Sequence, residues 1–457
     1  MGSEMCIRDS LERDDVTGSF PVIPCNEETI AGVTVLHHPL FTAGIDYTDM
    51  LLSLDHIDVD DLPYLSLLTS LIGAVDTENY SYSALSTAEY LTSGGIRITS
   101  RAIQDYHNPD VFTHKLLVSS KTLSPEDTAG FLNLAWEQLT KSDFSDKKRF
   151  REVVQMLKNQ IQMGIFQQGH TVVAGRVTAY HSAFSRFNEY LNGLDFLFFL
   201  QDLDNHFDER FDAVRARVED LYAKLLTRKG MIVSVTGSDE SYAAIRPLLA
   251  EWLERLPDVD YPHADWQVPV EVLNEGIQSS ANVQYVAKGA DLRALGVTYS
   301  GVMEVLSNLL TNDYLYNNIR AKGGAYGQGI RFSRNGSVSC YSYRDPNLEK
   351  TNEIYDGIPA YIEQFTADER DMTKYIIGTI SDMDVPMNPS TKGDRSMAAY
   401  LQNISYEEIQ KERDQVIGAT QEDIRGLRDM IASVLAENNL CVVGNEETLQ
   451  ASEGMFG

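Results

Sequence analysis

The sequence contains nine histidines, the side chains that most often bind zinc or act as general bases in enzymes. None of them forms H-x-x-E-H or H-x-x-x-H, spacings that present two metal ligands on one helix face. A catalytic zinc ion needs about three protein ligands and an open fourth position. The local spacing therefore predicts no self-contained zinc site. The histidines stand at positions 37, 38, 56, 107, 114, 170, 181, 206 and 263.

Two groups of residues could still join a site assembled from distant segments. His37 and His38 stand at the end of an expected strand, and His170 follows a Gln-Gly pair. The segment 181–185 adds one histidine and two serines, the residue types of a hydrolase. Neighbouring positions on a helix do not by themselves create a nucleophile, a base and an orienting acid. We expect a polar helix surface at 181–185 and no metal bound by this chain.

The glycine-rich segment 322–329 (KGGAYGQG) lacks the G-x-x-x-x-G-K-[ST] pattern and the strand-to-helix context of phosphate-binding loops. Its flanks are more informative. Arg320 closes an expected helix, and Tyr326 follows beyond a flexible Gly-Gly turn, so both side chains could face one cleft and donate hydrogen bonds to a peptide carbonyl. The alternative is structural: Arg320 in an ion pair at a helix end and Tyr326 packed at a turn.

The elements that must hold these residues follow from periodicity. Runs at 33–36 and 45–52 are β-rich and separated by a turn, so they are expected to pair. Leucines from Leu62 to Leu71 then follow helical spacing. From Ser124 to about Leu226 the pattern is helical, with one buried face between Phe150 and Ile165.

A buried strand is expected at 231–237, and the segment from Pro257 to Pro269, with three prolines, reads as an extended connection. The second half then repeats strand, helix, strands and helices, and ends in a strand at 440–444. The stretches 232–240 and 439–447 both run from a strand into glycine and acidic residues, which favours an internal duplication. The domain boundary is therefore placed at 257–270.

Composition limits the classes of partner. The 67 acidic and 38 basic residues give a net charge of −29, which repels phosphate backbones and anionic lipid surfaces. Nucleic acid and membranes are not expected partners, and no apolar run approaches the ~20 residues that span a bilayer. The four cysteines have no C-x-x-C spacing, which fits a reducing compartment. A cytoplasmic location is the expectation.

Several segments together resemble the presequence proteases of the pitrilysin/insulinase family. The most specific are 319–327 (IRAKGGAYG) and 342–347 (SYRDPN); the others are 40–47 (LFTAGIDY), 93–96 (SGGI) and 168–170 (QGH). The resemblance covers about residues 20 to 457. It implies an α+β fold with two tandem homologous α/β-roll domains, each a mostly antiparallel sheet packed by helices, together forming one bowl-like half of the family's peptide-enclosing chamber.

The resemblance also implies a domain division. Residues 21–256 would be the third family domain, 257–270 a linker, and 271–457 the fourth domain, which contacts substrate. Residues 1–20 match no family domain start and are expected to be either non-native sequence or a remnant of the hairpin that links the two halves.

For function, the resemblance implies the C-terminal half of a zinc metalloendopeptidase that degrades short unstructured peptides. Arg320 and Tyr326 would position the substrate backbone and support the transition state, and Gly323, Gly324 and Ala325 would contact the peptide. The zinc would be bound by an N-terminal half, the expected partner, and this chain alone is predicted to be inactive. The alternative is a non-catalytic binding or scaffolding subunit of a related peptidase complex.

Overall fold

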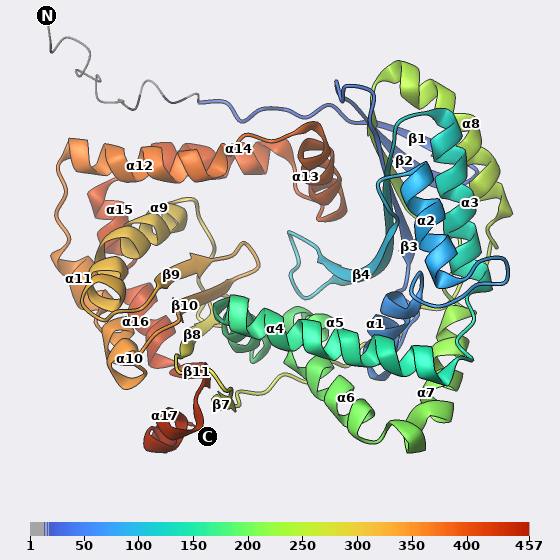
Figure 1. The fold of residues 1–457 in the computed structure, drawn as a ribbon. Coiled ribbons are helices and arrows are strands. Elements are labelled where there is room, and N and C mark those ends of the chain that lie inside the picture. Colours follow the sequence, from blue (N-terminus) through green and yellow to red (C-terminus); the bar gives the residue numbers. More distant parts are fainter. Residues whose placement is uncertain (1–12, 14–15, 17, 457) are drawn as a thin grey trace, which may run out of the picture.

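The computed structural model describes residue 13, residue 16 and residues 18–456. They form two mixed β-sheets, each covered by helices, so the predicted α+β class with two sheet-and-helix units is confirmed (Figure 1). Most of the segment 1–20, for which we predicted a separate N-terminal piece, lies outside the described residues.

The first sheet has six strands in the order β1-β2-β6-β3-β5-β4. Its strands are β1 (Asn26–Ile30), β2 (Val33–Pro39), β3 (Asp46–Ser53), β4 (Arg97–Gln104), β5 (Phe112–Thr122) and β6 (Ile232–Gly237). The helices of this part of the chain are η2 (Val59–Asp61), α1 (Leu62–Leu71), α2 (Tyr82–Thr92), α3 (Pro125–Lys141), α4 (Lys147–Ala179), α5 (Ala183–Asn192), α6 (Leu194–Asn205), α7 (Phe207–Tyr222) and α8 (Asp239–Arg255).

The predicted pairing of the first two β-runs is wrong. β2 and β3 lie in one sheet, but β6 is inserted between them, parallel to β2 and antiparallel to β3. The reason is that the turn between β2 and β3 crosses over the end of β6, where the Leu40 N–H donates to the Gly237 carbonyl at 3.2 Å. The intervening strand comes from almost 200 residues downstream, so local sequence does not reveal it.

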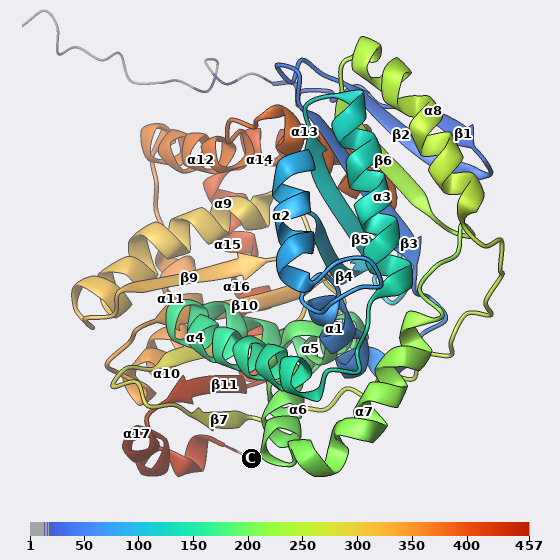
Figure 2. The ribbon, with the colours of Figure 1, turned by 45° about the vertical axis from the view of Figure 1, so that its right-hand side comes forward.

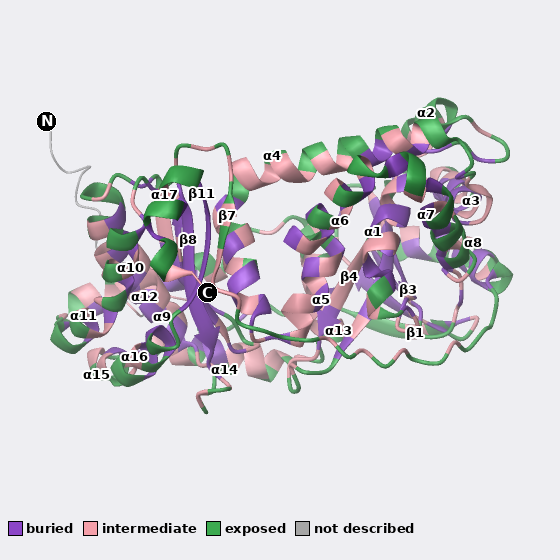
Figure 3. Ribbon diagram, turned by 90° about the horizontal axis from the view of Figure 1, so that it is seen from below, coloured by how far each residue is buried: buried purple, intermediate pink, exposed green. Residues whose placement is uncertain are grey.

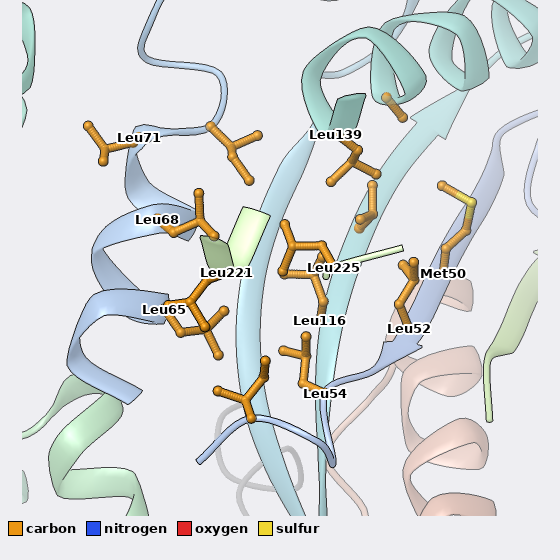
Figure 4. Packing of buried hydrophobic residues seen from close by; sticks show 14 of the residues in the cluster. Met50, Leu52, Leu54, Leu65, Leu68, Leu71, Leu116, Leu139, Leu221 and Leu225 are labelled. Atoms are coloured by element: carbon orange, nitrogen blue, oxygen red, sulfur yellow. The ribbon is translucent and has the colours of Figure 1, made fainter. Parts of the chain in front are cut away.

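The predicted helix at 62–71 is α1, and it supplies much of the first core. Leu65, Leu68 and Leu71 are fully buried in one cluster with Leu221 and Leu225, beyond which lie the sheet residues Leu52 and Leu116 (Figure 4). Burying a leucine side chain contributes about 2 kcal/mol, so this helical spacing holds α1 against α7 and β4. Figure 2 shows α2, α3 and α8 covering the same sheet.

The second sheet has the order β7-β11-β8-β10-β9. Its strands are β7 (Glu275–Gln278), β8 (Tyr285–Asp291), β9 (Gly327–Phe332), β10 (Ser337–Tyr343) and β11 (Asn439–Gly444). The helices are α9 (Val302–Leu309), η3 (Leu310–Tyr314), η4 (Tyr316–Ala321), α10 (Glu349–Asp356), α11 (Ile358–Gln364), α12 (Glu369–Met383), α13 (Pro389–Leu401), α14 (Tyr406–Ile417), α15 (Gln421–Gly426), α16 (Arg428–Ala436), α17 (Glu446–Ala451) and η5 (Glu453–Met455).

The two sheets share a topology. β6 lies between a parallel neighbour (β2) and an antiparallel one (β3), and β11 lies between a parallel neighbour (β7) and an antiparallel one (β8). After each of these strands a polar side chain, Ser238 or Asn445, caps the next helix by accepting a backbone N–H. The two stretches whose similarity indicated a duplication therefore occupy equivalent places.

Each sheet is also covered by a helix from the other half of the chain. The C-terminal part of α4 packs on β8, β10 and β11, where Val173 and Val177 are fully buried. Figure 3 shows β8 and β11 as buried strands. In return, α13 packs on β6 of the first sheet and buries Met397. Gly393 of α13 approaches so closely that a Cβ there would overlap the Thr236 hydroxyl oxygen.

A buried ion network reinforces this exchange of helices. The Arg176 guanidinium of α4 donates to Glu275 of β7 at 2.6 and 2.8 Å, to Glu189 at 2.9 Å and to Asp195 at 3.0 Å. The Tyr180 hydroxyl also donates to Glu275, at 3.0 Å. The network thus ties α4, α5 and α6 to the second sheet.

No helix or strand occupies 257–274, the stretch that contains the boundary predicted at 257–270 between a domain at 21–256 and one at 271–457. We retain these limits as a proposal. Among the described residues, no helix combines the length and apolar character that crossing a membrane requires.

Candidate functional site

Arg320 lies on η4, a π-helical turn that continues α9 and η3. Leu315 and Ile319 of this stretch are fully buried in the second core, whereas Tyr316 and Arg320 are exposed. Single π-helical turns inside helices occur often at functional sites. Here the turn holds the guanidinium on the outer side while its neighbours anchor it.

A glycine turn then reverses the chain. The Gly324 N–H donates to the Arg320 carbonyl at 2.9 Å, and the Ala325 N–H donates to the Ile319 carbonyl at 3.1 Å. Gly324 has a φ of +85°, and a Cβ on Gly323 would lie 2.5 Å from the Ile319 carbonyl oxygen. Both positions therefore require glycine. Ala325 is 4% exposed, so its side chain anchors the loop in the core.

The turn places Tyr326 beside Arg320. The guanidinium carbon lies 5.7 Å from the centre of the Tyr326 ring and 5.6 Å from that of Tyr316, both within cation–π range. The Tyr326 side chain is 65% exposed, so its hydroxyl is free to meet a ligand. Among the described residues, Arg320 forms no ion pair with a carboxylate. The ion-pair alternative considered for Arg320 is therefore not what the structure has.

The segment 342–347 supports this loop, a role that the sequence did not reveal. The Asn347 amide donates to the Gly323 carbonyl at 2.7 Å, and its backbone N–H donates to Asp345 at 2.9 Å. Asp345 is fully buried and also accepts the Thr351 hydroxyl at 2.7 Å. Tyr343 completes the support: its carbonyl accepts the Tyr326 N–H at 3.0 Å.

Helix α4 brings a histidine to the same place. The helix is kinked at Gln168, and the Tyr285 hydroxyl donates to the Phe166 carbonyl there at 2.6 Å. The Tyr285 ring packs so closely on Gly169 that a Cβ would lie 2.5 Å from it. Beyond the kink, the His170 ring contacts Tyr343, with 4.8 Å between ring centres. Resemblance indicated the QGH segment, but only the fold places it near the loop.

The other histidine candidates have structural roles. His37 is buried, stacks on Tyr242 with 4.1 Å between ring centres, and its Nε2 lies 3.1 Å from the Gly237 carbonyl oxygen. His38 hydrogen-bonds the Ser234 hydroxyl at 3.2 Å. In the segment 181–185, Ser182 caps α5 by accepting the backbone N–H three residues on.

Over the part of the chain that the structure describes, no group of three or more histidine, cysteine, aspartate or glutamate side chains could hold a metal ion. The residues around Arg320 and Tyr326 offer hydrogen-bond donors and aromatic surface instead. This arrangement can bind a polar, uncharged or anionic group, such as a peptide carbonyl, and no step that we derive proceeds through a metal held by this chain.

Comparison with known families gives two matches. Residues 10–203 match the associated domain of peptidase family M16, subfamily C, and residues 274–446 match the "PreP C-terminal domain". The second match contains Arg320, Tyr326 and the whole supporting loop.

Two curated relatives align over nearly the entire chain. "Protein HypA" of Clostridium perfringens (strain 13 / Type A) is 33% identical over 98% of this chain and 46% of its own length. "Presequence protease 1, chloroplastic/mitochondrial" of Arabidopsis thaliana is 28% identical over 97% of this chain and 41% of its own length. The chain therefore spans less than half the length of these relatives.

Solved structures share the fold at low sequence identity. A protease from Helicobacter pylori superposes with a TM-score of 0.62 at 14% identity, covering 93% of this chain and 99% of that chain. The "peptidase M16 inactive domain" from Pseudomonas fluorescens gives a TM-score of 0.61 at 13% identity, over 93% and 98% of the two chains. The two-sheet arrangement is thus that of one M16 peptidase half.

Proposed function

We propose that this chain holds the backbone of short unstructured peptides for cleavage. It belongs to the presequence-protease-like M16 peptidases and corresponds to their C-terminal half. In this proposal it closes one side of a peptide chamber. A zinc-bearing N-terminal half, the proposed partner, closes the other side.

The observation that carries the proposal is the pairing of Arg320 with Tyr326. Two exposed hydrogen-bond donors lie side by side on a loop fixed by buried neighbours and by two required glycines. Donors held in advance on a rigid loop lose little entropy when they bind a carbonyl oxygen, and they stabilise negative charge that develops on it.

Each residue has a distinct part. The Arg320 guanidinium supplies a fixed positive charge with several N–H donors, and the Tyr326 hydroxyl supplies one neutral donor. Gly323 and Gly324 leave room for the peptide backbone to approach the loop. Ala325, whose side chain is buried, contributes through the position of its backbone.

The proposal assigns zinc to the partner, where it would activate the attacking water. The residues of this chain then orient the peptide and exclude water from it. The cytoplasmic location remains a prediction. A scaffolding role is the second candidate, favoured by the "peptidase M16 inactive domain" from Pseudomonas fluorescens, which has the same fold.

Reconstitution tests the proposal. This chain would be mixed with the N-terminal half of the Clostridium perfringens relative, and zinc content and cleavage of a quenched peptide would be measured for each half and for the mixture. We expect cleavage in the mixture only, and about a hundredfold lower kcat with Arg320→Gln, the loss typical of removing one transition-state donor.

Matched controls separate chemistry from folding. Arg370→Gln removes an exposed arginine from α12, and Tyr90→Phe removes the hydroxyl of a tyrosine that is 76% exposed on α2. Both should leave cleavage unchanged, while Tyr326→Phe lowers it. Full activity of Arg320→Gln and Tyr326→Phe in a cleaving mixture would refute the positioning role. A stable complex that never cleaves peptide would support the scaffolding candidate instead.

A further inference from the structure

A continuous strip of rings runs from Arg320 to a second arginine, Arg331, along one face of the second sheet. We call the residues between the two arginines the aromatic strip; they come from the glycine loop, from β10 and from α4. In order, the contacts run through Arg320, Tyr326, Tyr343, His170, Tyr341 and Arg331. The successive distances are 5.7, 5.7, 4.8, 5.4 and 5.1 Å, measured between ring centres or, for the two arginines, from the guanidinium carbon to the ring centre.

Strand alternation explains why the strip lies on one face. In β9, Ile330 and Phe332 point into the core, so Gly327, Gly329 and Arg331 share the opposite face. The two glycines leave that face open, and the Tyr341 ring lies across it, so closely that a Cβ on Gly329 would overlap the Tyr341 hydroxyl oxygen. The rings thus form a surface, and Arg331 ends it.

A peptide would lie across this surface rather than extend the sheet at β9. Part of the outer edge of β9 is already occupied, since the Ile330 N–H donates to the Thr311 hydroxyl at 3.3 Å and the Ile330 carbonyl accepts from the Ser307 hydroxyl at 2.6 Å. Binding on the strip must therefore use side-chain groups and aromatic faces at this point.

Arg331 is exposed, and among the described residues it forms no ion pair with a carboxylate. Glu304 and Asp382 line a pocket of about 270 Å³ beside it without pairing with it. Burial, and next the charge of Arg331, hold the pKa of His170 below its ordinary value, so the imidazole is neutral and adds no charge of its own. Arg331 is thus the positive charge at this end of the strip.

We propose that Arg331 binds a carboxylate of the peptide that Arg320 and Tyr326 hold, either an acidic side chain or the terminal carboxylate. The inference rests on the proposed function. Tyr326 and Arg331 are five residues apart on an extended segment, a span of about 16 Å at about 3.3 Å per residue. An extended peptide covers that span with about five residues, so the carboxylate belongs about five positions from the residue at Tyr326.

The overall charge of the chain and the proposed Arg331 site predict opposite preferences for acidic peptides. At −29, the molecule repels acidic peptides at long range. Any preference for an acidic peptide must therefore come from local contacts, and a hydrogen-bonded carboxylate on an arginine supports about a tenfold gain in affinity.

Fluorescence anisotropy with this chain tests the inference. The probes are ten-residue, rhodamine-labelled peptides with one glutamate moved through successive positions, an all-glutamine reference, and each peptide with a free or an amidated C-terminus. We expect one register to bind about tenfold tighter than the reference, no such preference in Arg331→Gln, partial recovery in Arg331→Lys, and the wild-type pattern in the control Arg370→Gln. The free and amidated series tell a terminal carboxylate from a side chain.

The outcomes separate this inference from the proposed function. Binding that depends on Arg320 but shows no acid preference, or a preference that Arg331→Gln retains, overturns the Arg331 site and leaves the proposed function standing. Binding of no peptide, or binding indifferent to Arg320→Gln, overturns the Arg331 site, and the reconstituted cleavage assay decides the proposed function separately.

Discussion

Replacing Arg176 by methionine should destabilise the protein by about 3 to 5 kcal/mol. The guanidinium is 3% exposed, and its three partners Glu189, Asp195 and Glu275 are 7%, 16% and 22% exposed. Methionine fills much of the volume but leaves Glu189 and Glu275 in a poorly solvated place without their cation, while Asp195 keeps its ion pair with Arg186 at 2.7 Å. Removing one partner of a buried ion network costs about this much, because the remaining charge loses its compensation.

The pKa shift of Glu275 shows why this carboxylate depends on Arg176. Burial alone would raise the pKa of Glu275, but the hydrogen bonds and charge of Arg176 outweigh it and hold the pKa below its ordinary value. The stabilisation from Glu275 is therefore present above the unfolded-state pKa and is lost as the pH falls through the folded-state pKa. In Arg176→Met this acid-dependent loss should disappear.

Urea unfolding followed by two probes provides the assay. All three tryptophans pack in the core of the first sheet, so their fluorescence reports that sheet, whereas far-UV circular dichroism reports both. We expect coincident transitions in the wild type, because the network joins the two parts, and separated transitions at lower urea in Arg176→Met.

The control is Arg246→Met, which breaks a bidentate pair with Glu28 on the exposed surface. Exposed pairs contribute little, so its unfolding midpoint should stay near that of the wild type. Equal unfolding midpoints for the Arg176→Met and Arg246→Met variants would refute the argument that the buried network couples the two sheets. So would transitions by fluorescence and circular dichroism that coincide in both variants.

Three further predictions follow from single residues. His114 is fully buried and its pKa is lowered to about 3, chiefly by burial. The free energy of unfolding of the wild type should therefore fall as the pH drops from about 6.5 toward about 3. Between neutral pH and about pH 5, thermal unfolding should show that this free energy falls by about 2 kcal/mol less in His114→Phe than in the wild type. Gly393→Val forces a side chain against Thr236 and should expose the first sheet at α13, detected as faster amide exchange in β6; unchanged exchange would contradict the close packing. Gly324→Ala strains a turn with a φ of +85° and should weaken peptide binding at Tyr326 while global stability falls by only about 1 kcal/mol; unchanged affinity would argue against a fixed loop.

Local periodicity predicted the elements whose environment is simple. The leucine spacing between Leu62 and Leu71 predicts a helix with one buried face, which is α1. The apolar run at 440–444 predicts a buried strand, which is β11. The pairing of β2 with β3 was wrong because nothing between residues 33 and 52 records the insertion of β6. Strand order depends on contacts across almost 200 residues, which periodicity does not contain.

The candidate site could also be predicted only in part. Arg320 and Tyr326 are close in sequence, and the Gly-Gly turn between them indicated that they could face one cleft. Tyr343, His170 and Arg331 complete the surface from β10, α4 and β9. The resemblance indicated the segments that contain Tyr343 and His170, but neither segment shows that the two rings meet, and Arg331 belongs to no motif of its own. Only the packing of α4 on the second sheet brings them together.

That packing also explains why the two sheet-and-helix units depend on each other. Tyr285, Cys441 and Val443 are buried on the face of the second sheet that α4 covers, and without α4 this apolar face would meet water. The first sheet depends on α13 in the same manner. α4 is also the element that carries His170 to Tyr343. The contact that covers the second sheet is therefore the contact that completes the aromatic strip, and the second sheet without α4 would not present the surface that we propose binds peptide.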